Sequence, residues 1–161
     1  SMAIGEEKVF DRIRSVRPEA RCTTPITAAF AAFRALGARR IGVLTPYRAD
    51  VNRIVADYIG ARGFEVPVFG SFNEQDDGKV SRITPASVKQ SVKTILSHAP
   101  VDAVFVSCTS VRLAEAARGI EAETGVPITS SNHAMAWHAL RLAGITDVMP
   151  QWGRLFETQM A

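Results

Sequence analysis

The sequence contains little of what disulfide and metal sites require. It has two cysteines and three histidines in 161 residues, and Cys22 and Cys108 lie in dissimilar contexts that do not indicate a disulfide framework. His133 and His138 are five positions apart in a predicted helix, so their side chains point about 140° apart and cannot share a metal ion. No glycine-rich dinucleotide fingerprint follows a predicted strand. We therefore expect no metal, nicotinamide or other cofactor.

Long apolar runs are also missing. No run reaches the roughly 18 residues of a membrane-spanning helix, and nothing resembles a secretory leader. Lys and Arg number 19 against 16 Asp and Glu, a net charge of +3, and the basic residues are scattered rather than clustered. That balance suits a small anionic substrate, but it is not the footprint of a nucleic-acid-binding protein. We expect a cytoplasmic protein without a membrane or nucleic-acid partner.

What the sequence does contain is an alternation of helical patterns and short apolar strands. Apolar residues at helical spacing, with capping and stop residues, predict six helices: 4–16, 26–36, 50–62, 84–98, 112–124 and 132–143. Thr24 and Ser131 are the expected caps of the second and the last helix. Apolar runs fit for burial on both faces predict strands over 40–45, 64–69, 101–106 and 126–129. Helices that alternate with buried strands predict an α/β fold with a Rossmann-like parallel sheet.

Polar side chains gather where three of the predicted strands end. Residues 45–47 follow the first strand, residues 107–110 the third and residues 129–132 the fourth. Ligands of open parallel sheets bind at the carboxyl ends of the strands, so these hydroxyl, thiol and amide groups should share one rim. Neutral donors and free backbone N–H groups suit a carboxylate. A metal ion would instead need hard carboxylate ligands or clustered histidines.

Cys108 stands at the end of the third strand, directly before a helix that we expect to begin between Thr109 and Arg112. At a helix N-terminus, the positive end of the dipole would make the thiol easier to ionise. A thiolate can accept a proton and a thiol can return it, so Cys108 could serve as an acid and a base. A buried structural cysteine is the alternative, because free cysteine is among the most buried residue types. The residues alone leave both interpretations open.

Three sequence runs resemble one branch of the aspartate/glutamate racemase superfamily. They are RIGVLTPY at 40–47, FVSCTS at 105–110 and SSNHAMAWH at 130–138. The branch comprises the maleate cis-trans isomerases, the arylmalonate decarboxylases and the ectoine-utilisation racemase-like proteins, and the resemblance covers nearly the whole chain. It implies two similar α/β halves, an active site in the cleft between them, one cysteine from each half, and no cofactor.

The resemblance implies roles for five residues of this chain. Cys108 matches the catalytic cysteine of the second half, and Thr109 and Ser110 match positions whose backbone N–H and hydroxyl groups hold a substrate carboxylate. Tyr47 matches a tyrosine that reaches the substrate in the isomerases. Asp77 falls where the isomerases have a substrate-binding asparagine, and an aspartate there would repel a carboxylate unless it is protonated or turned away. Because of this difference from the isomerases, the ectoine-type proteins and other relatives remain alternatives to the maleate isomerases.

The same resemblance divides the chain into three parts. Residues 1–38 would be a remainder of the first half, residues 39–131 the intact second α/β domain, and residues 132–161 a C-terminal helix and tail that return to the first half. The first-half cysteine of the family falls before residue 1, so we expect the N-terminal part to be missing and do not expect Cys22 to replace that cysteine. Apolar surface left uncovered in this way favours self-association, and we expect a homo-oligomer.

These observations predict a cofactor-independent isomerase similar to the maleate cis-trans isomerases. Cysteine thiol and thiolate groups would move a proton on a small dicarboxylate or amino-acid substrate. An enzyme similar to the arylmalonate decarboxylases, or a racemase of ectoine degradation, is the alternative within the family. An alternative of another class is a non-catalytic α/β module that holds an anion at the same rim.

Overall fold

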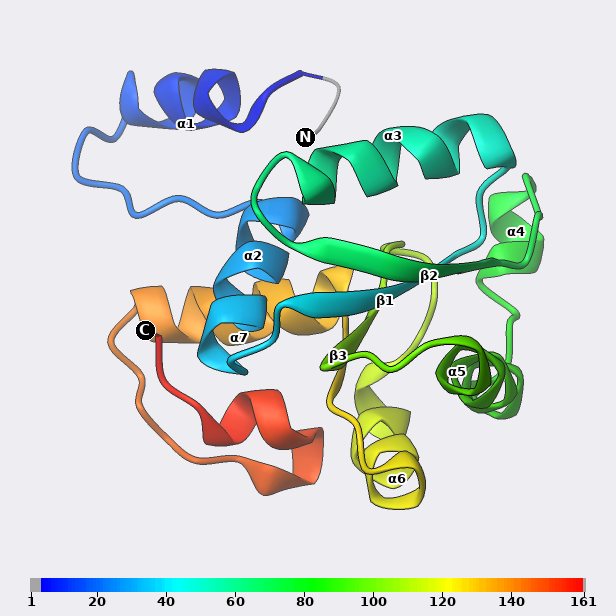
Figure 1. Cartoon of the computed structure of the whole chain (residues 1–161). Coiled ribbons are helices and arrows are strands. Elements are labelled where there is room, and N and C mark those ends of the chain that lie inside the picture. The colour runs from blue at the N-terminus through cyan, green and yellow to red at the C-terminus, as the bar shows by residue number, and fades with distance from the viewer. Residues whose placement is uncertain (1–3, 161) are drawn as a thin grey trace.

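The centre of the molecule is a single parallel sheet. The structure, a computed structural model, describes residues 4–160. Four strands pair in the order β2-β1-β3-β4 (Figure 1). They are β1 (Arg40–Thr45), β2 (Glu65–Ser71), β3 (Ala103–Val106) and β4 (Ile128–Ser130). Each of these strands corresponds to one of the predicted strands, and their parallel pairing confirms the predicted α/β class.

Helices connect the strands and cover both faces of the sheet. The six that the sequence predicts lie within two residues of their predicted bounds: α1 (Glu6–Arg14), α2 (Pro25–Ala35), α3 (Ala49–Gly60), α5 (Pro85–His98), α6 (Ala114–Thr124) and α7 (Ser131–Leu142). Three short segments were not predicted: α4 (Asp77–Val80) and the 3₁₀ helices η1 (Pro150–Trp152) and η2 (Arg154–Glu157). Within residues 4–160, no helix is both long enough and apolar enough to cross a membrane.

The caps of two helices can be compared with their predictions. Thr24 caps α2 as predicted, since its hydroxyl accepts the Thr27 N–H at 3.3 Å. The predicted cap of α7 is wrong by one residue, because Ser130 rather than Ser131 accepts the His133 N–H, also at 3.3 Å. The strand β4 runs into α7 without a loop, so the last extended residue of the strand becomes the cap.

The two faces of the sheet carry separate apolar cores. On one face, Ile41 and Phe105 pack against α2 and α3, and on the other face Val104 packs against α5 and α6 (Figure 1). Side chains that alternate along buried strands supply both cores. Gly42 faces α5 so closely that an added Cβ would lie 2.9 Å from Cγ2 of Ile95. A side chain at this position would therefore push α5 away from the sheet.

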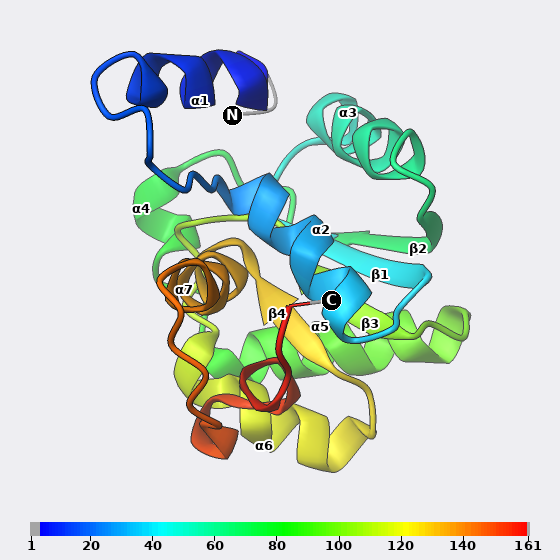
Figure 2. The same cartoon turned by 90° about the vertical axis from the view of Figure 1, so that its left-hand side faces the viewer.

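A third apolar cluster lies between α2, α7 and the C-terminal tail (Figure 2). Ala28 and Ala32 of α2 meet Trp137 of α7, which is fully buried, and Leu155 and Phe156 of the tail complete the cluster. Small side chains on α2 let the two helices approach each other closely. The division of the chain at 38/39 and 131/132 stays a prediction.

One buried cation holds the tail after α7. Arg141 is 5% exposed, and its guanidinium donates hydrogen bonds of 2.7 to 3.3 Å to the carbonyl oxygens of Ile145, Asp147, Phe156 and Thr158. A buried guanidinium is tolerated when its N–H groups find acceptors. Arg141 therefore fixes the path of the tail over α7.

The helix α1 is joined to the body by a few polar contacts and stands apart from it (Figure 1). The carboxylate of Glu6 accepts hydrogen bonds from the Tyr58 hydroxyl at 2.6 Å and from Arg62 at 3.2 Å. Phe10 is the buried residue of this helix. Apolar residues whose spacing predicted the helix are exposed, Ile13 by 41% and Val16 by 78%. Their spacing predicted the helix correctly, but it did not mark a buried face.

Candidate active site

The carboxyl ends of β1, β3 and β4 meet at one edge of the sheet, as parallel strands require. Leu44 of β1 pairs with Val106 of β3, and Val106 pairs with Ser130 of β4. The segments that follow these strands are therefore neighbours in space, with Tyr47 after β1 and Cys108 after β3. The three polar segments that the sequence placed at strand ends lie along this common rim.

Cys108 is the thiol of this rim. Its own N–H donates to the carbonyl oxygen of Val106 at 3.0 Å, and the residue is 4% exposed. The sulfur accepts a hydrogen bond from the N–H of Ser110, with 3.3 Å between nitrogen and sulfur. An N–H group that points at the sulfur stabilises the thiolate relative to the thiol. The backbone around Cys108 thus supports a group that can lose a proton and regain it.

The predicted start of the helix after Cys108 is wrong. The helix α6 begins at Ala114, and residues 109–113 form a loop. Val111 and Leu113 are both 2% exposed. Residues two positions apart point about 200° apart on a helix, whereas the bent loop over 109–113 turns both of these side chains into the core. Cys108 therefore does not lie at a helix N-terminus, and the donor to its sulfur is a peptide of the loop.

Tyr47 approaches Cys108 from the end of β1. Its half-buried ring packs against the apolar cluster that contains Cys108. Its carbonyl oxygen accepts hydrogen bonds from Asn52 at 3.0 Å and from the Ser71 hydroxyl, and its N–H donates to the Thr45 hydroxyl at 3.1 Å. Burial raises the pKa of Tyr47, and negative charge at the neighbouring Cys108 and at Asp77 raises the pKa further. The hydroxyl therefore stays protonated and can donate to a thiolate.

Asp77 lies on the same side of the rim as Tyr47. It is the first residue of α4, is exposed, and has a charge that contributes to the raised pKa of Tyr47. The neighbouring carboxylate of Asp76 caps this short helix by accepting the Lys79 N–H at 3.2 Å. The structure thus brings Tyr47, Cys108 and Asp77 together. Exposure lets the Asp77 carboxylate turn to solvent, which is one of the two ways in which it could coexist with an anionic ligand.

Thr109 and Ser110 differ in how their N–H groups are used. The N–H of Ser110 is directed at the sulfur of Cys108. Thr109 is exposed, and no residue in the described part of the chain accepts a hydrogen bond from its N–H. Its carbonyl oxygen accepts from Nδ2 of Asn132, at 2.6 Å, which links the loop to the start of α7. Of the two predicted carboxylate-binding amides, only that of Thr109 is open to a ligand.

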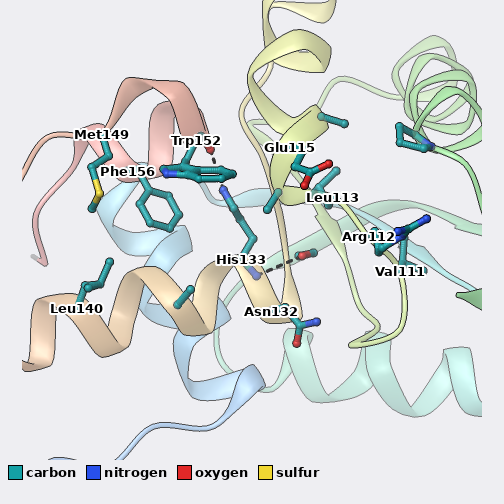
Figure 3. A pocket seen from close by; sticks show the side chains of 15 residues that line it. Val111, Arg112, Leu113, Glu115, Asn132, His133, Leu140, Met149, Trp152 and Phe156 are labelled. Atoms are coloured by element: carbon teal, nitrogen blue, oxygen red, sulfur yellow. Dashed lines mark hydrogen bonds between the residues drawn. The ribbon is translucent and has the colours of Figure 1, made fainter.

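A pocket of about 590 Å³ opens beside this loop (Figure 3). Its walls come from the loop, the starts of α5 and α6, α7 and the tail, with Val111, Arg112, Glu115, Asn132, Ala136, Leu140, Met149, Trp152 and Phe156 among the lining residues. Most of these side chains are apolar, and the charged ones, Arg112 and Glu115, are exposed. The sequence did not predict this pocket, because its walls combine segments that are far apart in the sequence and η1 was not foreseen.

His133 lies in the wall of the pocket (Figure 3). Its Nε2 lies 2.7 Å from the carbonyl oxygen of Trp152, so this nitrogen carries a proton and donates it. Its Nδ1 then accepts from the Thr129 hydroxyl at 3.1 Å. Burial lowers the pKa of His133, which keeps the ring neutral near pH 7. With both nitrogens occupied by fixed partners, His133 joins β4 and α7 to the tail.

The second cysteine lies in the segment before α2. Cys22 is half-buried and free, and its sulfur lies 3.5 Å from the carbonyl oxygen of Ala20. Across residues 4–160, no three His, Cys, Asp or Glu side chains gather where they could hold a metal ion.

Comparisons with known proteins agree with this geometry. A family model described as arylmalonate decarboxylase matches residues 7–156. The chain is 32% identical over 138 residues to arylmalonate decarboxylase of Bordetella bronchiseptica, which covers 84% of this chain and 58% of that protein. It is 28% identical over 160 residues to a maleate isomerase of Nocardia farcinica, which covers 97% of this chain and 62% of that protein.

Solved structures show the same fold. Nocardia farcinica maleate cis-trans isomerase superposes with a TM-score of 0.86 at 26% identity, over 94% of this chain and 62% of that one. Arylmalonate decarboxylase superposes with a TM-score of 0.77 at 32% identity, over 84% of this chain and 60% of that one. The chain thus spans about three-fifths of the length of these relatives. Because the family model covers nearly all of the sequence, this chain belongs to the arylmalonate decarboxylase family.

Proposed function

We propose that this chain carries the thiol acid/base of a cofactor-independent isomerase, similar to the maleate isomerases, that acts on a small dicarboxylate. The observation that supports this most is the buried thiol of Cys108 at the rim of the sheet, whose sulfur accepts a hydrogen bond from the N–H of Ser110. Family membership supports it too, since several relatives are named maleate isomerase. Cys108 would be the catalytic residue, and the substrate would bind against Tyr47, Thr109, Ser110 and Asp77.

In this reaction Cys108 would move one proton. A second thiolate, which the family resemblance assigns to the cysteine of the first half, adds to one alkene carbon of maleate and forms a C–S bond. The electron pair of the double bond shifts to the neighbouring carbon, where the adjacent carboxylate takes it up as an enediolate. Cys108 gives its proton to that carbon, which leaves a single bond that can rotate. The Cys108 thiolate then takes the proton back, the double bond re-forms, and the nucleophile leaves from the trans isomer. The Ser110 N–H and the Tyr47 hydroxyl stabilise the thiolate between the two transfers.

The open N–H of Thr109 would hold the carboxylate next to the reacting carbon. Negative charge grows on that carboxylate as the enediolate forms, and a fixed donor placed there lowers the barrier. The exposed Arg112 and the net charge of +3 help to attract a dianion. Asp77 opposes such a ligand wherever its carboxylate faces the rim.

A decarboxylase is the second candidate, and the apolar pocket favours it. An arylmalonate carries an aromatic group, and the pocket of about 590 Å³ beside the loop offers apolar walls. In that reaction the substrate loses carbon dioxide, and the electron pair left on carbon is stabilised as an enediolate. Cys108 protonates the carbon, and water restores the thiol. The 32% identity to an arylmalonate decarboxylase supports the same candidate.

We also propose that the chain forms a homo-oligomer in the cytoplasm. Ile4, Ile13 and Val16 are exposed by 63%, 41% and 78%, which is apolar surface of the kind that packs against another chain. Both cysteines are free thiols, as a reducing compartment maintains them. Sedimentation velocity measures the state of association, and a chain that stays monomeric at all concentrations would contradict the proposal.

Matched thiol variants test the proposed activity. The complete protein, with both of the cysteine-bearing halves that the family resemblance implies, is incubated in heavy water with maleate and, separately, with an arylmalonate, and NMR follows both the products and the deuterium incorporated from solvent. Cys108→Ser is expected to lose on the order of 10²-fold or more of the turnover, the scale of a general acid/base contribution. Cys22→Ser, which changes the other thiol in the same way, is expected to keep it.

A second measurement compares how fast a thiol reagent alkylates Cys108 and Cys22 in the same protein. Maleate or a malonate should protect Cys108 from a thiol reagent and leave the reaction of Cys22 unchanged. Full turnover by Cys108→Ser would contradict the acid/base role. Protection of Cys108 without any Cys108-dependent turnover would instead favour a non-catalytic module that binds an anion.

A further inference from the structure

The loop after Cys108 is anchored at its two ends in different ways. On the near side, the N–H of Ser107 donates to the carbonyl oxygen of Leu44 at 2.8 Å, which ties the start of the loop to β1. On the far side, Val111 and Leu113 are buried in the core. Between these anchors, one side chain from outside the loop bonds to the loop backbone, among the residues that the structure describes. Nδ2 of Asn132, in the first turn of α7, donates to the carbonyl oxygen of Thr109 at 2.6 Å.

That carbonyl and the donor to the sulfur belong to the same peptide group. The carbonyl oxygen of Thr109 and the N–H of Ser110 lie on opposite sides of one planar amide. Asn132 holds the oxygen on one side, and the N–H on the other side points at Sγ of Cys108 at 3.3 Å. Rotating this peptide would turn its N–H away from the sulfur. A rotation of about 180° would aim the negative end of the carbonyl at the sulfur instead.

We infer that Asn132 is a positioning residue for Cys108, because it fixes the Thr109–Ser110 peptide plane and so keeps the Ser110 N–H directed at the sulfur. The inference rests on the proposed acid/base role of Cys108, and it adds the residue that adjusts how easily this thiol ionises. The hydrogen bond from Asn132 also polarises the amide, which strengthens its N–H as a donor. Asn132 is the second residue of a twelve-residue helix whose first turn is capped by Ser130, so the backbone that carries its side chain is held in place.

The pH dependence of Cys108 alkylation tests this role. The Cys22→Ala protein leaves Cys108 as the single thiol, and its reaction with iodoacetamide is timed from roughly pH 5 to pH 10. Asn132→Ala removes the donor without adding a charge, and Asn132→Asp keeps the size but has no proton to donate. Gln159→Ala is the matched control, because Nε2 of Gln159 donates to the carbonyl oxygen of Thr146 at 3.0 Å in the tail. It removes the same kind of amide-to-carbonyl bond.

Both Asn132 variants are expected to move the pH midpoint of alkylation upward by about one unit, the scale of one hydrogen bond to a charged group. Gln159→Ala should leave the midpoint in place, and thermal unfolding of Asn132→Ala should stay close to that of its parent. An unchanged midpoint in Asn132→Ala would overturn the inference. A shift in Asn132→Asp alone would overturn it as well, since charge would then be the cause. Alkylation needs no substrate, so the outcome does not depend on whether the protein isomerises maleate.

Discussion

Two buried titratable side chains stand close to the rim of the sheet, and their partners give them different roles. The sulfur of Cys108 accepts a hydrogen bond from the Ser110 N–H, and its proposed role is to exchange a proton with a ligand. His133 has both ring nitrogens bonded to fixed groups of the protein. Its ring therefore holds elements together, and a change in its charge acts on stability rather than on a substrate.

Burial lowers the pKa of His133, which makes stability depend on pH. In the unfolded chain a histidine binds a proton below about pH 6.5. The folded ring resists that proton, because it would be charged without water around it and Nδ1 would lose its role as an acceptor. Between the unfolded pKa and the lowered folded pKa, the unfolded state binds more protons. The free energy of unfolding is therefore expected to fall as the pH drops below about 6.5.

His133→Gln should weaken this acid dependence, because a glutamine amide does not titrate. Urea unfolding at a series of pH values measures the slope, and His98→Gln, at an exposed position of α5, is the control that should keep it. Burial also lowers the pKa of His138, so part of the dependence should remain in the variant. Identical slopes for the wild type and His133→Gln would show that His133 does not titrate in this way.

At the scale of elements, those with their own local signals were predictable from sequence. The helix α5 has a capping threonine, Thr84, a proline in its first turn, and buried residues at Val88, Val92 and Ile95 with helical spacing. The helix α4 spans four residues, too few for a periodic pattern to form. The helices η1 and η2 depend on a contact with Glu121 of α6, and no local sequence pattern reveals that contact. The start of α6 was not predictable for the same reason. It depends on the burial of Val111 and Leu113 in the folded protein, which no local sequence pattern reveals.

In the candidate site, too, the residues that carry a sequence signal were predictable and the others were not. Cys108 and Tyr47 were foreseen because they end strands of a parallel sheet and match a family pattern. Asn52 and Ser71, which hold the carbonyl of Tyr47, were not, because they come from α3 and from the end of β2 and carry no signal of their own. The bond from Asn132 to the loop needed the pairing of β3 with β4 to be known first.

The turn between η1 and η2 is built around a buried carboxylate. Glu121 of α6 is 4% exposed and accepts the N–H groups of Ile128 at 2.9 Å and of Arg154 at 2.8 Å. Gly153 has a φ of +94° and a ψ of 175°, a combination that glycine alone adopts readily. A Cβ at this position would lie 2.8 Å from Oε2 of Glu121. Backbone and space therefore both require glycine here.

Gly153→Ala is expected to destabilise the protein by about 1–3 kcal/mol, from the strained backbone and the displaced carboxylate. Gly119 gives the opposite control, since it lies inside α6 and an added Cβ would have no neighbour within 4 Å. Gly119→Ala should stabilise by about 0.5–1 kcal/mol, because alanine loses less entropy in a helix. Chemical denaturation measures both changes, and equal effects at the two glycines would contradict this account of the turn.

At the scale of the whole molecule, the helix α2 belongs to two apolar cores. Ile26, Phe30 and Phe33 face the sheet, whereas Ala28 and Ala32 face α7 and the tail (Figure 2). The predicted divisions at 38/39 and 131/132 assign α2 and α7 to the first half of the protein, apart from the sheet. The side chains that α2 directs at the sheet are much larger than those directed at α7, and apolar stabilisation grows with the area buried.

Hydrogen exchange can show which core α2 follows. Trp137→Phe weakens the cluster between α2, α7 and the tail, and Ile120→Ala weakens the core between the sheet and α6 by removing the same number of side-chain heavy atoms. Because its larger side chains meet the sheet, we expect the amides of α2 to stay protected in Trp137→Phe while those of α7 and the tail exchange faster. That result would move the boundary from 38/39 to a point before Pro25. Faster exchange of α2 together with α7, and none in β1 or β3, would instead support the division at 38/39.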